Sequence, residues 1–225
     1  HAATDLMAYK EAGYLPDALL NMLAKLGWSN TTEDIFTMER LIEIFEIDDI
    51  QRAGAVFDIE RLNFVNQGHI ANIENSELLE MIEVFNKRND FTLNDHHDAH
   101  YLVELCKGSG NTLDEISKFI KPFVVKFDEY NQEDFDKHLI NAKPVIDYFI
   151  EKLESLDNWN EESIEAIISD AKEELELPMP KIGLPLRVAL LGRAKSPQLN
   201  STIYLIDKEV VMERLKNSLS VISEC

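Results

Sequence analysis

The sequence has few of the residues that would tie it to an oxidising compartment, a membrane or an irregular fold. It contains two cysteines, Cys106 and Cys225, too few for a disulfide framework, so a cytoplasmic protein is expected. No apolar run reaches the ~18 residues that a membrane-spanning helix needs. The eight glycines and seven prolines fall between periodic stretches rather than inside them, which is typical of a helical protein.

Positive charge is also scarce. The 225 residues include 42 acidic and 22 basic ones, which gives a formal net charge of −20. The negative field of such a protein disfavours non-specific binding to nucleic acid or anionic lipid, so neither DNA nor a membrane is expected as a partner. An apolar content of 45% with 28% charged residues is typical of a globular protein and excludes a disordered one.

Catalytic motifs are missing as well. The chain has no G-x-S-x-G elbow, no phosphate-binding loop of the G-x-x-x-x-G-K type and no dinucleotide fingerprint. Carboxylates are abundant, but nothing singles out two of them as an acid and base pair. The sequence therefore predicts no catalytic residue.

The segment DHHDAH, residues 95–100, is the best metal candidate. On a helix, His96 and His100 would lie one turn apart on one face, a spacing that can hold Zn²⁺. A closed site needs about four ligands, and Cys106 is the only other soft ligand nearby. A polar helix start with solvated histidines is the preferred interpretation, so no metal and no other cofactor is predicted for this chain.

Two stretches illustrate the helical patterns. In residues 16–27, Pro16 suits a first turn and Gly27 suits a left-handed C-terminal position. The apolar stripe expected to face the core there is Leu19, Leu20, Leu23 and Leu26. In residues 58–68, Asp58 is the expected cap and Gly68 the expected stop.

A capping box begins the helix that follows residue 111. The Thr112 hydroxyl can accept from one early amide while the Glu115 side chain reaches back to another. Pro122 is expected to end or bend this helix near Ile120.

The β-branched stretches 123–127 and 201–206 have no partner strand in view. The predicted fold is therefore all-α, with multi-helix bundle subdomains over residues 1–72, 73–143 and 144–225.

One basic window interrupts the acidic background. Residues 178–206 contain no acidic residue and four basic ones: Lys181, Arg187, Arg193 and Lys195. A short helix over residues 185–191, closed by Gly192, would bury Val188, Leu190 and Leu191 and let the two arginines reach out from its ends. Guanidinium groups can fork onto phosphates or stack on bases. Charge alone leaves a second interpretation open, in which four solvated cations balance the acidic run 157–176.

The glycine-rich segment KGSGN, residues 107–111, allows two interpretations. It is a flexible linker, or an anion contact made with the free amides at the start of the following helix.

Three long stretches carry a resemblance to a known family. They are YLPDALLNMLAKLGWS (14–29), FDIERLNFVNQGHI (57–70) and GLPLRVALLGRAKSPQLNSTIYLIDKEVVMERL (183–215). In this order they resemble the C-terminal part of bacterial glutamyl-tRNA synthetase, a class I aminoacyl-tRNA synthetase. The resemblance spans nearly the whole chain and is weakest over 86–111. Residues 1–16 resemble the segment after the family's KMSKS-type loop, and the chain opens on His1 rather than Met, so a fragment of a longer protein is expected.

The resemblance implies that catalysis and tRNA binding belong to different parts of the protein. The Rossmann-like catalytic domain with the HIGH and KMSKS motifs, which uses ATP and Mg, would lie upstream, so the fragment should be inactive alone. Residues 1–72 would form a stem-contact region, and two helical anticodon-binding subdomains would follow. The implied partner is glutamate tRNA, bound by a monomer.

The resemblance also places the basic window beside the anticodon loop. Arg187, Arg193 and Lys195 are then the main candidates for RNA contacts, with Lys181 as a weaker one. A local basic patch outweighs the net charge within a Debye length of roughly 8 Å.

Lys107 and Ser109 complete the set of candidate RNA-binding residues. An arginine that the family associates with the last anticodon base falls on Ser109. Its absence removes a bidentate donor and a penalty against a wrong base of ~1–3 kcal/mol. The hypothesis is that glutamine tRNA is accepted as well.

Two other functions stay open at this stage. One is an acidic all-helical interaction module that docks a basic protein and uses its arginines in internal salt bridges. RNA binding should weaken steeply with salt, whereas a packed protein interface should change less. The other is a small metal-dependent hydrolase built on the histidines.

Overall fold

The computed structural model describes residues 5–28, 32–50 and 56–224. In these ranges every regular element is helical, and the one β-type pairing is an isolated bridge between Trp28 and Ile50. The all-α prediction is confirmed. None of the helices in these ranges is long and apolar enough to cross a membrane.

The chain forms two compact units, His1–Ile120 and Lys121–Cys225. The predicted division into three helical subdomains, at residues 72 and 143, stays a prediction. Helices of the first unit are α1 (Leu6–Glu11), α2 (Pro16–Gly27), α3 (Met38–Ile44), the 3₁₀ turn η1 (Ile47–Asp49), α4 (Ile59–Ala71), α5 (Asn75–Arg88) and α6 (Ala99–Cys106). Helix α7 (Leu113–Val124) contains the residue at which the units divide.

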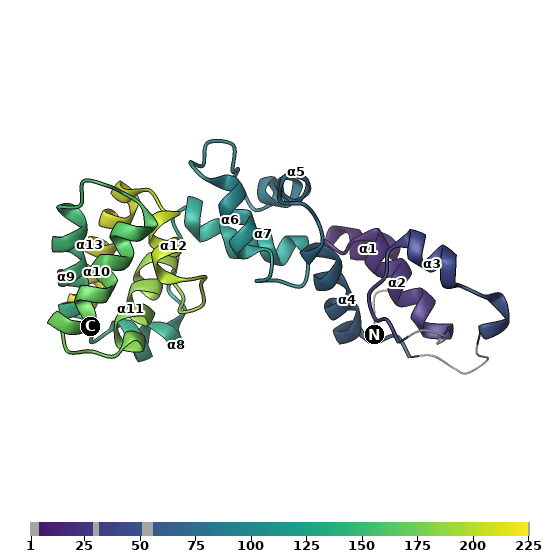
Figure 1. Ribbon diagram of the computed structural model, residues 1–225. Helices are drawn as coiled ribbons and strands as arrows, with labels where there is room; N and C mark the ends of the chain where they lie inside the picture. Colours follow the sequence, from purple (N-terminus) through teal and green to yellow (C-terminus); the bar gives the residue numbers. More distant parts are fainter. Residues whose placement is uncertain (1–4, 29–31, 51–55, 225) are drawn as a thin grey trace. The chain divides into compact units, whose positions relative to one another are not determined.

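The helices of the second unit follow α7 (Figure 1). They are α8 (Gln132–Asp134), the wide π turn η2 (Phe135–Leu139), α9 (Lys143–Glu154), α10 (Glu161–Glu174), α11 (Met179–Leu191), α12 (Leu199–Tyr204) and α13 (Lys208–Glu224). The strand-like stretch 201–206 is therefore largely helical.

In the first unit, α2 packs on α3 and α4, and α5 packs on α6. Leu19 and Met22 of α2 meet Leu62 of α4 in a buried cluster. The predicted stripe on α2 is wrong in part, because Leu20 and Leu23 are exposed. Spacing alone identified an apolar stripe but not which edge of it α4 would cover.

Gly27 and Gly68 do not act as the predicted helix stops. Gly27 is the last residue of α2 and lacks a left-handed backbone, and α4 continues past Gly68 to Ala71. A Cβ on Gly68 would lie 2.1 Å from Ile35 Cδ1. Ile35 therefore packs closely against Gly68 and would have to shift if a Cβ were added, and this contact could not be read from the neighbours of Gly68 in sequence.

The predicted caps are confirmed. The Asp58 carboxylate accepts from the Glu60 amide at 2.9 Å. At α7, the Asn111 amide donates to Glu115 Oε2 at 2.7 Å and the Glu115 amide donates to Thr112 Oγ1 at 3.3 Å. The helix does not end near Ile120, because burial of Phe123 favours a further turn that includes Pro122.

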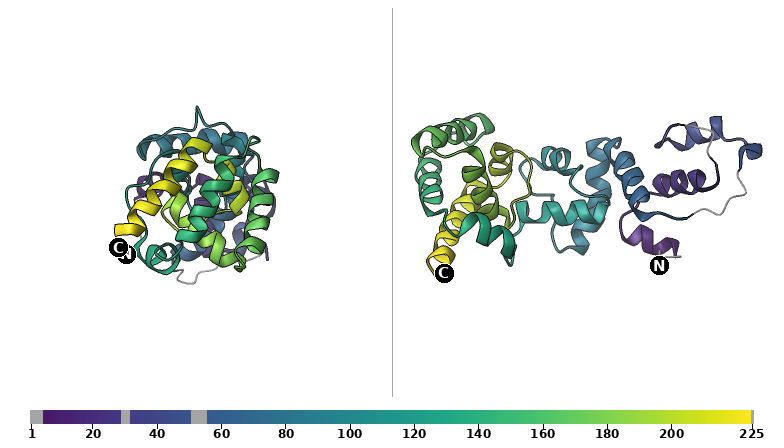
Figure 2. Two further views of the ribbon diagram at one scale, coloured as in Figure 1. Left: turned by 90° about the vertical axis from the view of Figure 1, so that its left-hand side faces the viewer. Right: turned by 90° about the horizontal axis from the view of Figure 1, so that it is seen from below.

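Helix α11 is the central helix of the second unit. It packs against η2, α9, α10, α12 and α13, and Figures 1 and 2 show helices α9 to α13 gathered as one bundle. Its buried residues are Ile182, Gly183, Pro185, Leu186, Val188, Ala189, Leu190 and Leu191. A helix apolar on most of its circumference belongs in a core. It begins at Met179 rather than at Pro185, since Pro180 already occupies the first turn.

Candidate nucleic-acid interface

The part of the basic window from Arg187 to Pro197 forms a turn between two helices, which we call the basic corner. Helix α11 ends at Gly192, whose φ of 72° is left-handed, and α12 begins after a short loop. A Cβ on Gly192 would lie 2.8 Å from Phe127 Cδ2, so the turn needs glycine for its backbone and for its packing. The predicted closure by Gly192 and the burial of Val188, Leu190 and Leu191 are confirmed.

The sequence predicted that the Arg187 side chain reaches out from the helix, and the structure shows that it does not. Its side chain is half-buried and folds along the loop, with Nε donating to Ser196 Oγ at 2.8 Å and Nη2 donating to the Pro197 carbonyl at 3.3 Å. A Cβ on Gly183, one turn earlier, would lie 2.7 Å from Nη1. Burial lowers the pKa of Arg187, but a guanidinium stays charged in a protein.

The hydrogen bonds of Arg187 hold its guanidinium in place and use only part of its N–H groups. Of five N–H groups, two are used by the loop. The other three have no partner in the part of the chain that the structure describes. The partners are a hydroxyl and a carbonyl rather than carboxylates, so the positive charge is not neutralised. An oriented cation with spare donors suits a phosphate or a base edge.

The loop between the helices is held by further bonds. The Ala194 amide donates to Asp134 Oδ2 at 2.8 Å, and Arg193 Nε donates to the Lys195 carbonyl at 3.2 Å. Ser196 Oγ also lies 3.0 Å from Thr202 Oγ1 of α12. Arg193 is half-buried and Lys195 is exposed. The structure thus brings Arg187, Arg193 and Lys195 onto one short corner.

Lys181 is the one cation of the window outside this corner. It is exposed on the first turn of α11. Arg187 lies six positions further along the helix, which corresponds to about 9 Å along the axis and about 120° around it. It therefore faces another side of the helix.

Lys107 and Ser109 lie in the first unit, in the turn between α6 and α7. Lys107 Nζ donates to Asn75 Oδ1 at 3.3 Å, and the Ser109 amide donates to the Cys106 carbonyl at 2.9 Å. Gln67 Nε2 donates to the Gly108 carbonyl at 3.3 Å. The segment is a bonded turn rather than a loose linker.

The histidine segment does not form the helical pair that a metal site would need. Helix α6 begins at Ala99, so His96 precedes it and does not share a helical face with His100. The rings of His96 and His97 stack with centroids 4.7 Å apart, and the Asp98 amide donates to His96 Nδ1 at 3.1 Å. Within residues 5–28, 32–50 and 56–224, no three side chains of metal-binding type are grouped.

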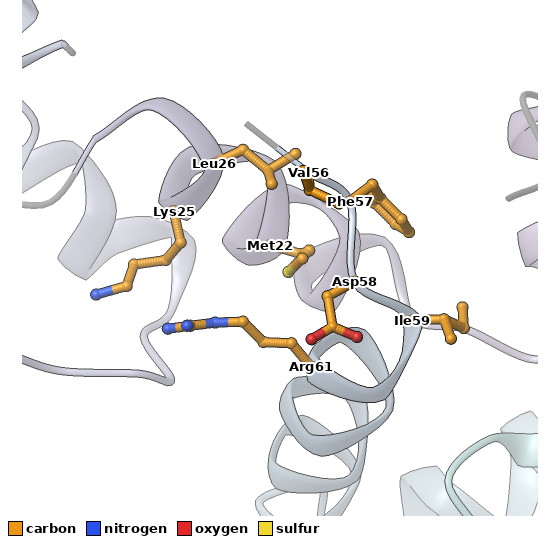
Figure 3. Close-up of a pocket in the computed structure, with 8 residues that line it drawn as sticks. All are labelled: Met22, Lys25, Leu26, Val56, Phe57, Asp58, Ile59 and Arg61. Carbon is orange, nitrogen blue, oxygen red and sulfur yellow. The ribbon is translucent and has the colours of Figure 1, made fainter. Parts of the chain in front are cut away.

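Two cations in the first unit were not singled out by the sequence. Lys25 of α2 and Arg61 of α4 line a surface hollow of 640 Å³, and Figure 3 shows both side chains ending on the same side of it. Arg61 Nη2 lies 2.9 Å from Asp34 Oδ1, and Lys25 Nζ donates to the Glu33 carbonyl at 3.0 Å. They lie far apart in sequence, so no local pattern joined them.

A third cation, Arg214 of α13, was also missed. Its side chain is only 4% exposed, and it shares the buried face of α13 with Val211 and Ser218. It binds backbone carbonyls at the ends of other elements rather than solvent.

A helical bundle whose corner presents an oriented guanidinium beside two further cations is suited to binding nucleic acid. Comparison with known families agrees with this geometry. Residues 74–219 match the family described as "Anticodon binding domain", and the chain belongs to that family. Residues 1–64 match the model described as "tRNA synthetases class I (E and Q), catalytic domain".

Similar curated proteins carry a more specific name. The chain is 33% identical over 215 residues to glutamate–tRNA ligase 2 of Nitratiruptor sp., a match that covers 95% of this chain and 46% of that protein. It is 34% identical over 222 residues to glutamate–tRNA ligase 1 of Sulfurimonas denitrificans, covering 98% of this chain and 47% of that protein. The chain thus spans under half the length of these relatives.

Solved structures that resemble this chain carry similar names. A glutamate tRNA ligase from Elizabethkingia meningosepticum, in complex with its amino acid, has a TM-score of 0.81 at 25% identity over 98% of this chain and 45% of its own. The glutamate-tRNA synthetase of Elizabethkingia anophelis has a TM-score of 0.79 at 26% identity, over 97% of this chain and 44% of its own.

Proposed function

We propose that this chain is the tRNA-binding part of a glutamate–tRNA ligase and that it recognises the anticodon arm of glutamate tRNA. The family match over residues 74–219 and the names of the relatives support the proposal. The observation that carries it is the guanidinium of Arg187, which is oriented by two hydrogen bonds and keeps three N–H groups for a ligand.

The corner offers a physical route to recognition. Anticodon bases are unstacked in their loop, so their edges and faces are open to side chains. The spare N–H groups of Arg187 bind a base edge or a phosphate, and the fixed side chain loses little entropy on binding. Arg193 and Lys195 add positive potential beside it, which offsets the repulsion from a protein of charge −20.

We expect the first unit to contact the tRNA stem rather than the anticodon. Residues 1–72 act as the stem-contact region, where the hollow lined by Lys25 and Arg61 offers two cations to the backbone. Residues 73–143 and 144–225 form the two anticodon-binding subdomains. Lys107 and Lys181 contribute weaker phosphate contacts.

Glutamylation itself is assigned to the rest of the ligase. ATP and Mg would be used there, and this chain would bind tRNA without charging it. We expect the chain to act in the cytoplasm and to be a monomer.

The test is a binding titration of a bacterial glutamate tRNA transcript against the full chain. Arg187→Met should weaken binding by about tenfold or more, since a hydrogen bond to a charged group contributes about 1.5–3 kcal/mol. Arg187→Lys should also weaken it, because lysine keeps the charge and loses the planar fork. Lys216→Met is the matched control, because it removes an exposed cation from α13 that pairs with Glu154 at 3.2 Å.

Salt dependence separates this proposal from a protein-interaction module. The three cations at the corner contribute about −2 to the slope of log K against log salt, at ~0.7 per contact with single-stranded RNA, and the other phosphate contacts make the total slope steeper. A salt-independent interaction, or equal binding by the parent and Arg187→Met, would contradict the proposal.

Acceptance of glutamine tRNA is a separate part of the proposal. It is motivated by the short side chain of Ser109, and the relatives' names mention glutamate alone. We expect Ser109→Arg to increase the preference for glutamate tRNA over glutamine tRNA, measured with the two transcripts in parallel. Strong discrimination by the parent chain would rule the idea out.

A further inference from the structure

Arg214 is a buried cation without a carboxylate partner. It lies on α13 with 4% of its surface exposed, and in residues 5–28, 32–50 and 56–224 no carboxylate forms an ion pair with it. Burial lowers its pKa to about 10, so it remains charged at neutral pH. A charge removed from water needs compensation from elsewhere in the protein.

Two helix ends supply that compensation. Nη1 donates to the carbonyls of Pro122 and Leu190, and Nη2 donates to the Val125 carbonyl at 3.0 Å. These carbonyls belong to the last turns of α7 and α11 and the residue after α7. The last carbonyls of a helix lack partners within the helix and carry partial negative charge. One guanidinium therefore joins the C-terminal ends of α7 and α11 to α13.

The same guanidinium is linked to the basic corner through Phe127. Its central carbon lies 5.7 Å from the centroid of the Phe127 ring, and this ring packs directly against Gly192. The Gly192 carbonyl accepts from the Asn131 amide at 2.7 Å. Arg214, Phe127 and Gly192 thus form a continuous stack that ends where the corner begins.

We propose that Arg214 is a positioning residue for RNA recognition: by holding the ends of α7 and α11 together, it fixes the loop that carries Arg193 and Lys195. This inference rests on the proposed function. Arg214 is buried and does not touch the RNA. Its loss would free the loop to sample other conformations, and binding would then have to order it again.

Arg214→Lys and Arg214→Met in the full chain test this role. Lysine keeps the charge but cannot donate to three carbonyls in the same fixed geometry, and methionine removes every donor. Binding of glutamate tRNA is measured well below the melting temperature of each variant. We expect affinity to fall on the order of tenfold in both, within the range seen for residues that act without touching the ligand.

The salt slope distinguishes positioning from direct contact. Because Arg214 neutralises no phosphate, the slope should stay that of the parent chain. Lys195→Met is the comparison, since loss of one phosphate contact should reduce the slope by ~0.7.

Leu153→Ala controls for stability alone. Leu153 is fully buried on α9, beside Glu154, whose carbonyl accepts from Lys208 at the start of α13. This variant should melt earlier than the parent and bind tRNA with the parent affinity. An equal loss of affinity in Leu153→Ala, or unchanged affinity in both Arg214 variants, would overturn the inference.

A measurement without RNA separates this inference from the proposed function. Trypsin can cleave after Arg193 and Lys195, and a loosened loop should be cut several-fold faster in Arg214→Met than in the parent or Leu153→Ala. If the parent fails to bind tRNA, the proposed function is lost. If trypsin cleaves Arg214→Met and the parent at equal rates, Arg214 does not hold the loop, whether or not tRNA binds.

Discussion

Gly183 controls the position of the Arg187 guanidinium from one helical turn away. A Cβ added there would lie 2.7 Å from Nη1 and would displace the end of that flexible side chain. We expect Gly183→Ala to leave the melting temperature unchanged or higher, since alanine favours a helix interior by about 1 kcal/mol over glycine. RNA affinity should fall by about tenfold, the effect of ~1.4 kcal/mol.

The matched control for this prediction is Gly27→Ala. Among residues 5–28, 32–50 and 56–224, its added Cβ would meet only Ile50 Cγ2, at 4.0 Å, so none of these side chains has to move. Thermal melts and tRNA titrations of both variants check the prediction. Parent affinity in Gly183→Ala would show that the placement of Arg187 is unimportant.

His69 makes the first unit sensitive to acid. The ring is half-buried, with Nε2 3.1 Å from Asn21 Oδ1, and burial lowers its pKa below the ordinary value. Between the lowered and the ordinary pKa, the unfolded chain binds more protons than the folded one, so stability falls as the pH drops through this window. The free energy of unfolding, measured by urea titration between about pH 7 and pH 5, should fall less in His69→Gln than in the parent.

At the scale of elements, the left-handed end of α11 determines where the basic corner turns. Gly192→Ala should destabilise the protein by at least about 1–2 kcal/mol, the cost of a left-handed backbone for a residue with a Cβ. Contact with Phe127 adds to this cost. Gly108→Ala is the control, since a Cβ there meets no atom of the described residues within 4 Å, and urea unfolding should leave it within about 0.5 kcal/mol of the parent.

Helix starts marked by a capping side chain were predicted better than the helix ends at Gly68 and near Ile120. Asp58 and Thr112 were identified correctly because a cap bonds to an amide only two or three residues away. The predicted ends at Gly68 and near Ile120 were wrong, because α4 continues to bury Ile70 and α7 continues to bury Phe123, whereas a bend at Pro122 stays a prediction. These contacts come from other parts of the chain, so local sequence did not contain them.

At the scale of the whole molecule, the two compact units should respond separately to core mutations. Leu78→Ala in α5 and Leu153→Ala in α9 each remove a fully buried side chain, at a cost of about 2–5 kcal/mol. Hydrogen exchange should speed up mainly within the unit that carries each substitution. Equal loss of protection in both units would show that they unfold as one.

The candidate interface was only partly predictable. The run of residues 178–206 without an acidic residue identified Arg187, Arg193 and Lys195, since charge patterning is visible in sequence. The bonds from Arg187 to Ser196 and Pro197 were not, because they depend on how the loop returns across α11. Lys25 and Arg61 share a hollow only because α2 packs on α4.

The sequence by itself determined the helical class, the capped helix starts at Asp58 and Thr112 and the segment in which positive charge gathers, because each depends on neighbouring residues. Tertiary structure decided which face of α2 is covered, that Ile35 packs against Gly68 and that Arg214 is buried against the ends of two helices. Periodicity specifies an amphipathic helix, but the surface that buries it is built from residues distant in the chain, and only folding brings them together.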